Sequence, residues 1–566
     1  MADKWWETAV GYVLNPQTFL DTNGDGIGDF PGITQRLPYL KDLGVNLLWL
    51  GPIFASPMDD NGYDVSDYKA INPMYGTMED FDAFLKEAHK LGFHVLLDFS
   101  LNHTSDEHPW FQKALKDPKA KERDYYIIRP GKKEGGKLLP PNNWKSFFET
   151  SAWERIPGSE DFYLHLFSKK MPDVNWTCPE LKEQYYDALR FWLEKGVDGF
   201  RLDAIAHLAK DMSFEDGTQN IDAHGLSYDL TKFSNRPELY DILKGLRDEV
   251  FSKYPCLIVG EVGGDITPEH ALRLVNYNDG VMNMIFHFDT AWNNGAYESY
   301  DKSDADIVTD VIQMKDNFMR WYNVLNGKAD MPLYWCNHDH PRVLSQYGSE
   351  QYRNESAKML LTTILFLYGT DFIYYGDEIG MSNVHYDSLE DFAKHDSGNR
   401  GEIAALQAKG YDDERILHYL NRTSRTNART PFQWNHKENA GFTTGKPYQK
   451  LNDNFPTVNL QDEMEDPYSI VNFYQYAIGF RKDPVINDIV LHGPLSLIDR
   501  NHPDVFSYIH EGTEKLMVIS NFRPYTVYFS FYFQINDILL HNYGDVIIKD
   551  HVFELRPYES FLLKIR

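Results

Sequence analysis

Short apolar runs alternate with helical patterns along most of this 566-residue chain. Residues 45–50 are almost continuously apolar, which is typical of a strand that is covered on both faces. Residues 79–91 instead place apolar side chains at helical spacing and are followed by Gly92, a residue that favours helix C-termini. Strands and helices joined by short connections predict right-handed βαβ units and a parallel sheet.

The alternation predicts eight strands, and hence a (β/α)8 TIM barrel of the α/β class. The active site of such a barrel lies at the carboxyl ends of its strands. We expect strands at residues 8–14, 45–50, 94–99, 199–203, 257–261, 281–286, 333–337 and 372–375, and helices at residues 32–43, 79–91, 181–195, 237–254, 307–325, 356–368 and 469–482.

Two regions depart from the alternation. Residues 104–174 are polar and rich in proline and lysine, and we expect an inserted subdomain after strand 3, because bare loops of this length are uncommon. From residue 483 onward the pattern changes to short β-rich pieces, which predict a C-terminal antiparallel β-sandwich over residues 483–566. The catalytic barrel would then comprise residues 1–103 and 175–482.

The charge balance disfavours several classes of partner. The chain has 56 Lys and Arg residues against 84 Asp and Glu residues, a formal net charge of −28. This charge repels nucleic acids and anionic membranes, so a neutral small molecule is the better match. Cys178, Cys256 and Cys336 lack the spacing of a disulfide framework or a zinc site. No organic cofactor is expected.

The first six residues contain no basic region followed by an apolar core, and no later run approaches membrane-spanning length. We therefore expect a cytoplasmic protein. A monomer is favoured.

Arg201 and Asp203 stand two positions apart on an apolar predicted strand, so their side chains share one face. Taken alone, this pair is as compatible with a structural ion pair as with a catalytic one. Glu261 and Asp339 are also placed at strand ends of the predicted barrel. Three carboxylates without a zinc-type His/Cys cluster favour acid–base and nucleophilic chemistry, which is typical of glycoside hydrolysis.

Short motifs surround these carboxylates. They are Asp98-x-x-x-Asn102-His103, Gly199-Phe200-Arg201-x-Asp203, Gly260-Glu261, Asn337-His338-Asp339, Trp49-Leu50-x-Pro52-Ile53 and Gly369-Thr370-x-x-Ile373-Tyr374-Tyr375. In this order they resemble the α-amylase superfamily, glycoside hydrolase family 13. Residues 61–64, 171–176 and 428–434 narrow the resemblance to the oligo-1,6-glucosidase and α-glucosidase branch. The resemblance covers essentially the whole chain.

The resemblance implies a role for each carboxylate. Asp203 would be the nucleophile, kept ionised by Arg201. Glu261 would act first as the acid and then as the base, with its proton retained through burial and neighbouring carboxylates. Asp339 would stabilise the oxocarbenium-like transition state and bind ring hydroxyls.

The resemblance also implies a pocket for one terminal glucose. His103 and His338 would hydrogen-bond the sugar, Tyr63 would offer its ring face, and Asp64 with Arg429 would close the pocket around the terminal hydroxyls. Other polar residues near the strand ends have structural interpretations: His207 packs behind its strand, Glu378 ends strand eight, Asp98 orients its neighbours, and His340 either supports the fold or lines the acceptor side.

A second candidate site is the segment from Asp21 to Asp29. Its oxygen donors alternate and a glycine stands sixth, as in the first half of an EF-hand loop, but Gly32 stands twelfth in place of Glu. An acidic turn without metal is the alternative. A matching loop in the resembled branch binds calcium, which implies a structural ion, Ca2+ or Mg2+, held by Asp21, Asn23, Asp25, the Ile27 carbonyl and Asp29.

The resemblance implies a retaining, exo-acting α-glucosidase that releases glucose from the non-reducing end of short α-glucosides through a covalent glucosyl-enzyme intermediate. Members that prefer α-1,6 bonds carry Val where this chain has Ala204, and Met171 replaces a Gln that is common among them. Ala204 leaves room on the acceptor side. We therefore expect a broad specificity that accepts maltose-type α-1,4 bonds and extends to isomaltose-type α-1,6 bonds.

Three alternatives remain open. Sugar as well as water can intercept a glycosyl-enzyme intermediate, so the chain is also compatible with a transglucosylase or a disaccharide isomerase similar to trehalose synthase. A trehalose-6-phosphate hydrolase would require a phosphate pocket that the sequence does not reveal. A catalytically dead partner of a membrane transporter ranks last, because all three carboxylates are present.

Overall fold

The computed structural model describes residues 4–148, 150–394 and 396–566, so the first three residues of the predicted barrel domain lie outside the described part. Eight parallel strands form one sheet in the order β13-β12-β11-β5-β2-β1-β15-β14, and the two end strands, β13 and β14, contact each other. The predicted (β/α)8 barrel is therefore confirmed. Its strands are β1 (Val10–Leu14), β2 (Leu47–Leu50), β5 (His94–Ser100), β11 (Gly199–Asp203), β12 (Leu257–Glu261), β13 (Met284–Phe286), β14 (Pro332–Leu333) and β15 (Thr370–Tyr374).

The register of the central strands determines which side chains meet at the rim. Arg201 on β11 is paired with Asp98 on β5 and with Val259 on β12. Because parallel strands end on the same side of the barrel, the last residues of β5, β11 and β12 lie at one rim. This register places Asp98, Arg201 and Asp203 within side-chain reach of Glu261.

Helices connect successive strands, and their ends follow local sequence signals. In α3, Thr77 and Asp80 form a capping box at the N-terminus. α5 starts at Pro179 and is followed by Gly196 with φ of 103°, a conformation that glycine adopts without strain. The connecting helices are α2 (Phe30–Leu43), α3 (Met78–Lys90), α5 (Pro179–Lys195), α6 (Leu239–Glu249), α7 (Pro268–Val275), α8 (Val311–Leu325), α10 (Arg353–Leu365) and α15 (Ile470–Lys482).

Most predicted helix ends lie close to the observed ones. The predicted helices 32–43, 79–91, 181–195 and 469–482 begin and end within two residues of α2, α3, α5 and α15. α7 was not predicted; its eight residues bury Pro268 and three apolar side chains, which is too short a pattern for a clear helical period. β14 is shorter than predicted because residues 334–337 leave the sheet.

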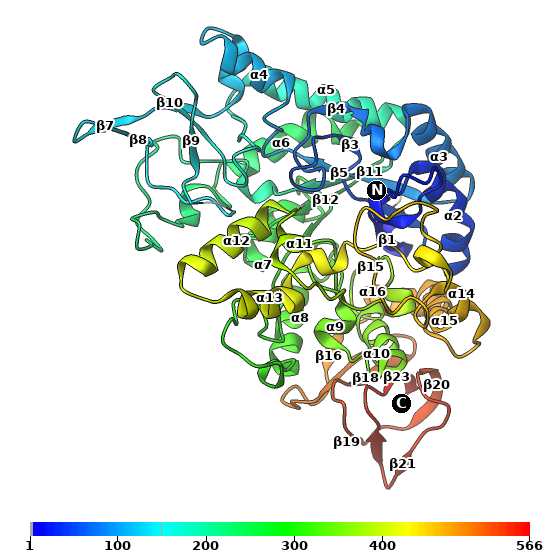
Figure 1. Cartoon of the computed structure of the whole chain (residues 1–566). Helices are drawn as coiled ribbons and strands as arrows, with labels where there is room; N and C mark the ends of the chain where they lie inside the picture. Colours follow the sequence, from blue (N-terminus) through cyan, green and yellow to red (C-terminus); the bar gives the residue numbers. More distant parts are fainter. Residues whose placement is uncertain (1–3, 149, 395) are drawn as a thin grey trace.

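The segment after β5 forms a small layer of its own at one end of the molecule (Figure 1). Its core contains Trp144, Trp153 and Leu164, and it also includes Phe233 from the connection that follows β11. Two distant segments therefore build this layer together. Its elements are α4 (Pro109–Lys116), β6 (Ile128–Pro130), β7 (Lys132–Glu134), β8 (Lys137–Leu139), β9 (Trp153–Arg155) and β10 (Asp161–Leu164).

A helical segment follows β15 and was not predicted from the strand–helix alternation. It packs through its own apolar core, which includes Phe392 and Tyr419. The segment matters for the site because it leads to Arg425 and Arg429, which reach the barrel rim. Its helices are α11 (Leu389–Ala393), α12 (Ser397–Ala408) and α13 (Asp413–Thr423).

The C-terminal region begins with α16 (Pro484–His492), where only short strands were expected. Asp483 caps this helix through the N–H groups of Val485 and Ile486, and Pro484 occupies its first position. Two antiparallel sheets follow, in the orders β16-β17-β18-β23-β20 and β19-β22-β21. Their strands are β16 (Leu495–Leu497), β17 (Val505–His510), β18 (Lys515–Asn521), β19 (Val527–Ser530), β20 (Ile535–His541), β21 (Ile548–Lys549), β22 (Val552–Leu555) and β23 (Ser560–Ile565).

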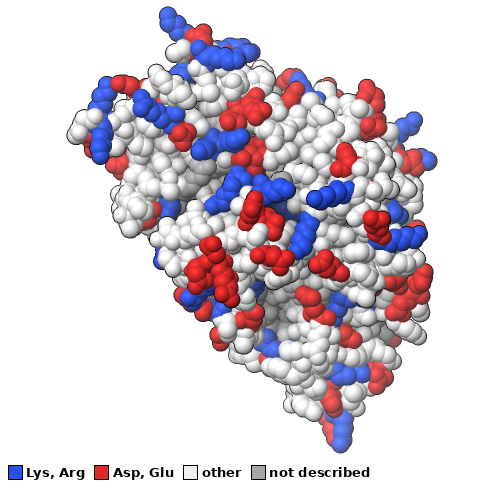
Figure 2. Space-filling model, viewed as in Figure 1, with Lys and Arg blue, Asp and Glu red and all other residues white. Residues whose placement is uncertain are grey.

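The described helices include none that is both long and apolar enough to cross a membrane. On the face shown in Figure 2, acidic and basic side chains are interspersed.

Candidate active site

Arg201 is the centre of the polar cluster at the barrel rim. Its side chain is 1% exposed, and Nη1 donates to Asp98 Oδ1 at 2.7 Å and to Asp203 Oδ1 at 2.8 Å. Trp49 Nε1 and Tyr63 OH donate to the other oxygen of Asp98, at 3.2 and 2.9 Å. Both oxygens of Asp98 are thus hydrogen-bonded, as expected for an orienting residue, whereas the contact of Asp203 with Arg201 is made through Oδ1.

Glu261 lies at the other side of the same guanidinium. Arg201 Nη2 forms an ion pair with Glu261 Oε2, and the Glu261 side chain is 16% exposed, against 12% for Asp203. The expected deep burial of Glu261 is therefore only partial. Asp203 and Glu261 share one cation and both face the open side of the rim.

Asp339 follows β14 and is held from the opposite side. Arg425 Nη1 and Arg429 Nη2 each donate to Asp339 Oδ1 at 3.0 Å, and His338 Nε2 lies 3.1 Å from Oδ2. Burial alone would raise the pKa of Asp339, but His338 and the two arginines together hold it well below its usual range. Burial lowers the pKa of His338, so the two arginines supply the compensating charge at neutral pH.

Asp203 has the opposite electrostatic environment. Burial raises its pKa to about 7; Arg201 opposes this rise, and Asp98 and Asp339 add to it. The pKa values of Asp203 and Asp339 are therefore shifted in opposite directions. Environments that separate the pKa values of neighbouring acids are typical of acid–base sites.

Two aromatic side chains build the floor of the pocket. The rings of Tyr63 and His338 are stacked at 5.5 Å with an angle of 20°, and the Tyr63 hydroxyl also contacts His338 Nε2. His103 lies between Ser100 and Asn102, and burial lowers its pKa to about 4, so its ring is neutral. Neutral imidazoles can both donate and accept hydrogen bonds, which suits sugar hydroxyls.

Asp64 is held within its own loop. Its carboxylate is fully buried and accepts hydrogen bonds from Ser56 Oγ and from the backbone N–H groups of Asp59 and Asp60. These three hydrogen bonds order the 56–64 loop. The structure brings Tyr63, His103, Arg201, His338 and Arg429 to one region, and the expected role of Asp64 beside Arg429 stays a prediction.

The acidic partner on the pocket side is Asp60, which sequence reasoning missed. Arg425 Nη2 donates to Asp60 Oδ1 at 2.8 Å, and Arg425 Nε donates to Asp396 at 2.7 Å. Because Arg425 also contacts Asp339, one guanidinium joins three acids. Asp60 directly precedes the Asn61-Gly62-Tyr63-Asp64 motif, but its partner lies 365 positions away, so only the fold reveals the pair.

The other polar residues have structural contacts. His207 Nδ1 lies 3.1 Å from the carbonyl of Phe233, and Glu378 accepts hydrogen bonds from Tyr12 and Tyr39 inside the barrel wall. His340 is buried, and neither ring nitrogen has a hydrogen-bond partner among the described residues. These contacts agree with the packing role expected for His207. Glu378 does not end the strand as expected, because β15 ends at Tyr374 and Glu378 lies in the following 3-10 turn Asp377–Ile379.

The family model described as "Alpha amylase, catalytic domain" matches residues 13–489. The chain belongs to the α-amylase family. An oligo-1,6-glucosidase from Parageobacillus thermoglucosidasius is 40% identical over the full length of both chains. Among solved structures, trehalose-6-phosphate hydrolase from Bacillus licheniformis is 36% identical, with a TM-score of 0.88 over 99% of each chain. Isomaltulose synthase from Erwinia rhapontici NX5 is 34% identical, with a TM-score of 0.92 over the full length of both chains. The resemblance inferred from the motifs is confirmed.

Ala204, which follows Asp203 in this α-amylase family member, has a left-handed backbone with φ of 47° and ψ of 33°. This conformation turns the chain sharply at the end of β11. A β-branched side chain is disfavoured there on steric grounds. Ala204 is 4% exposed, and it brings less side-chain bulk into this turn than a valine would.

The loop from Asp21 to Asp29 is organised by backbone N–H groups. Asp21 accepts from the N–H groups of Asn23, Gly24 and Gly26 at 2.8 to 2.9 Å. Asp29 accepts from Thr22 and caps α2 through the Gly32 N–H. Among the described residues, no group of three or more His, Cys, Asp or Glu side chains is arranged to hold a metal ion.

Proposed function

We propose that this protein is an exo-acting α-glucosidase that hydrolyses short α-glucosides with retention of configuration. The observation that carries the proposal is the arrangement of Asp203 and Glu261 about one buried arginine, with Asp339 held separately across the same rim. Relatives named oligo-1,6-glucosidase and alpha-glucosidase support the substrate class. The interspersed charges of Figure 2 suit a neutral sugar.

In the proposed first step, Asp203 attacks the anomeric carbon and forms a glucosyl ester. Glu261 transfers a proton to the glycosidic oxygen as the bond to the leaving sugar breaks. In the second step, Glu261 takes a proton from water, whose oxygen displaces Asp203 and releases glucose. Asp339 stabilises the positive charge that develops on the ring in both steps.

The geometry requires one rearrangement for this chemistry. Glu261 must carry a proton to act as the acid, and its carboxyl group is in contact with Arg201. Entry of a sugar between Glu261 and Arg201 would break this contact. Arg201 would remain bound to Asp98 and Asp203, so the nucleophile would keep its compensating cation.

Contacts across the rim support exo action. Arg425 joins Asp60 and Asp339, and Arg429 Nε donates to the backbone carbonyl of His338 at 2.7 Å. In the proposed complex these contacts would close the site behind the terminal glucose. His103, His338 and Tyr63 would bind that glucose through its hydroxyls and one ring face.

Ala204 supports acceptance of α-1,4 as well as α-1,6 bonds. Replacing it by Val would add bulk beside the nucleophile and a β-branched side chain at positive φ. The Ala204→Val variant should lose maltose hydrolysis more than isomaltose hydrolysis, measured as the ratio of the two kcat/KM values. An unchanged ratio would disprove this role for Ala204.

Disaccharide isomerisation or transglucosylation is the second candidate, favoured by the similarity to isomaltulose synthase. Trehalose-6-phosphate hydrolysis is favoured in the same way by the similarity to that hydrolase. A single assay distinguishes them: incubation with maltose, isomaltose, trehalose, sucrose and trehalose 6-phosphate, with free glucose and new disaccharides measured together. Glucose from maltose or isomaltose supports the first proposal, and new disaccharides from sucrose or maltose support the second. No glucose from any disaccharide would overturn the proposal.

We also propose that the 21–29 loop holds a structural cation, Ca2+ or Mg2+. Asp21, Asn23, Asp25, Asp29 and the Ile27 carbonyl provide oxygen donors of the kind that these ions prefer. Gly24 and Gly26 have φ of 85° and 90°, which allow the loop to turn tightly enough to bring alternate donors together. Because three carboxylates do not converge here, the site depends on the amide and carbonyl oxygens as well.

We propose a cytoplasmic monomer that acts on small oligosaccharides. Cys178, Cys256 and Cys336 are free thiols, as is typical of a reducing compartment. Sedimentation or light scattering at several concentrations tests the oligomeric state, and a mass of twice 65.9 kDa at all of them would contradict it.

A further inference from the structure

A second cavity lies between the barrel and the C-terminal region. It has a volume of about 990 Å³ and is bounded by the 292–309 loop after β13, α9 (Val343–Tyr347), α13 and the segment from Phe522 to Tyr525. None of the catalytic or pocket residues described above lines it. We propose that this cavity is a second binding site for a neutral oligosaccharide, distinct from the catalytic pocket.

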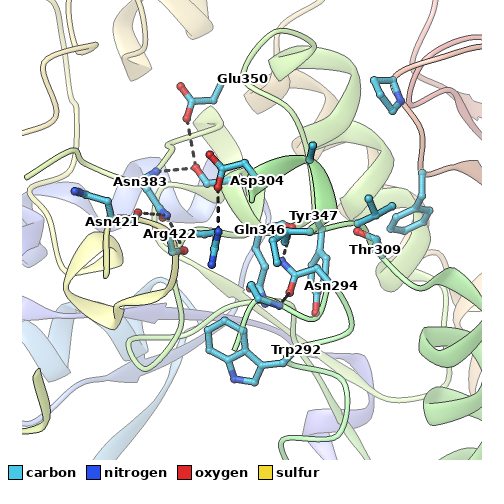
Figure 3. Close-up of a pocket in the computed structure, with 18 of the residues that line it drawn as sticks. Trp292, Asn294, Asp304, Thr309, Gln346, Tyr347, Glu350, Asn383, Asn421 and Arg422 are labelled. Carbon is cyan, nitrogen blue, oxygen red and sulfur yellow. Dashed lines mark hydrogen bonds and ion pairs between the residues drawn. The ribbon is translucent and has the colours of Figure 1, made fainter. Parts of the chain in front are cut away.

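The cavity has the mixture of surfaces that sugars require. Trp292 is half-buried at its base, and Tyr525, which is 53% exposed, stands at its outer edge. Aromatic rings of this kind pack against the apolar face of a pyranose ring. Figure 3 shows Trp292, Asn294 and Gln346 among the residues that line the cavity, so an indole ring and two side-chain amides contribute to its wall.

One buried group in the wall lacks a partner. Gln346 is 8% exposed; its Nε2 donates to the carbonyl of Ala291, but its Oε1 has no hydrogen-bond partner among the described residues. Leaving a buried acceptor unpaired carries a free-energy cost. A rotation of the Gln346 amide toward the cavity would let a sugar hydroxyl donate to Oε1 and remove this cost.

The charges in the cavity argue for a neutral ligand over an anionic one. Arg422 is paired with Asp304 at 3.0 Å, and Arg523 is paired with Asp504 at 2.6 Å. His418 also lies 3.2 Å from Asp304. Since each cation already has an acidic partner, a phosphate group would compete with carboxylates, whereas a hydroxyl would bind alongside them.

The cavity also lies close to the catalytic loop. The Trp292 ring meets the ring of His340 edge-on, at 5.5 Å and 80°, and His340 directly follows Asp339. A sugar that packs on Trp292 is thus separated from the catalytic loop by one side chain. The volume fits a short oligosaccharide, since small-molecule sites usually occupy about 300–1,000 Å³.

Calorimetric titration with maltotriose tests the proposal in the full-length protein. Saturating deoxynojirimycin, an iminosugar analogue of glucose, occupies the catalytic pocket and prevents hydrolysis. We expect one maltotriose to bind per chain under these conditions. Trp292→Ala and Tyr525→Ala should each weaken this binding at least about tenfold. Tyr528→Ala is the matched control, because Tyr528 is 65% exposed in the same region but lies outside the cavity.

Tyr525→Ala keeps the test decisive if Trp292→Ala fails to fold, because Tyr525 is largely exposed. Absence of maltotriose binding with the inhibitor present would overturn the proposal, as would equal affinity in wild type, Tyr525→Ala and Tyr528→Ala. Tighter binding of glucose 6-phosphate than of maltotriose would also overturn it, since that result requires an unpaired cation. Loss of hydrolysis in the substrate assay would count against the catalytic proposal alone.

Discussion

Acidic side chains gather at the rim around Arg201 and in the loop from Asp21 to Asp29, and their charges are compensated in different ways. At the rim, the guanidinium of Arg201 forms ion pairs with Asp98, Asp203 and Glu261. In the loop, backbone N–H groups bind both oxygens of Asp21. A shared side-chain cation can give up one contact when a substrate enters, whereas backbone donors hold a carboxylate in place. The rim is therefore suited to chemistry and the loop to structure.

The largest expected effect is on Asp203. Asp203→Asn should reduce kcat by at least about 10³-fold, because an amide cannot form the glucosyl ester. Initial rates with maltose and with an aryl α-glucoside measure this loss, and circular dichroism verifies the fold. Asp25→Asn in the loop is the matched control and should keep kcat within about twofold. Full activity in Asp203→Asn would remove the distinction between the two acidic regions.

The second prediction concerns Arg425. Its guanidinium forms ion pairs with Asp60, Asp339 and Asp396, just as the guanidinium of Arg201 pairs with three acids. Arg425→Lys should reduce kcat/KM about 10²-fold, because an ammonium cannot reproduce a planar fork that reaches three carboxylates. Arg400→Lys is the control, since Arg400 pairs with Asp59 at 3.0 Å and is 41% exposed. A lower melting temperature with unchanged kcat/KM would show that Arg425 is only structural.

A third prediction uses pH. Burial raises the pKa of Asp203 to about 7, and the nucleophile must be ionised. The ionised fraction therefore falls as pH drops through that value, and kcat/KM should decrease about tenfold per pH unit below it. Asp339 stays ionised at these pH values because its pKa is held well below its usual range, so it adds no change to the pH profile of kcat/KM. A flat profile between about pH 5 and 7 would contradict the environment assigned to Asp203.

The smallest effect is expected for the loop. Removing the cation with a chelator should lower the melting temperature by on the order of 2 °C and leave kcat at 25 °C within about twofold. Asp25→Asn should remove this dependence on the chelator. If the chelator changed neither activity nor melting temperature, the cation proposal would fail. If it abolished activity at 25 °C, the loop would not be purely structural.

Sequence patterns predicted the barrel well because its strands and helices are specified locally. Residues 45–50 are apolar except for Asn46 and contain β2, and the spacing in residues 79–91 predicted α3, which Thr77 caps. The helices after β15 were harder to predict, because their core forms among themselves and not against the sheet. α7 was missed because eight residues carry little periodic signal.

The chain by itself determined which residues stand at the strand ends, because an alternating strand with two charges two positions apart must bring them to one face. That sufficed to place Arg201 and Asp203 together, and the order of strands in the predicted barrel placed Glu261 at the same rim. Only the tertiary structure decided that Asp60, and not Asp64, meets Arg425, since hydrogen bonds within the 56–64 loop determine which acid points inward. The partner of Asp60 lies 365 positions away, and no local pattern encodes a contact between segments so far apart in the sequence.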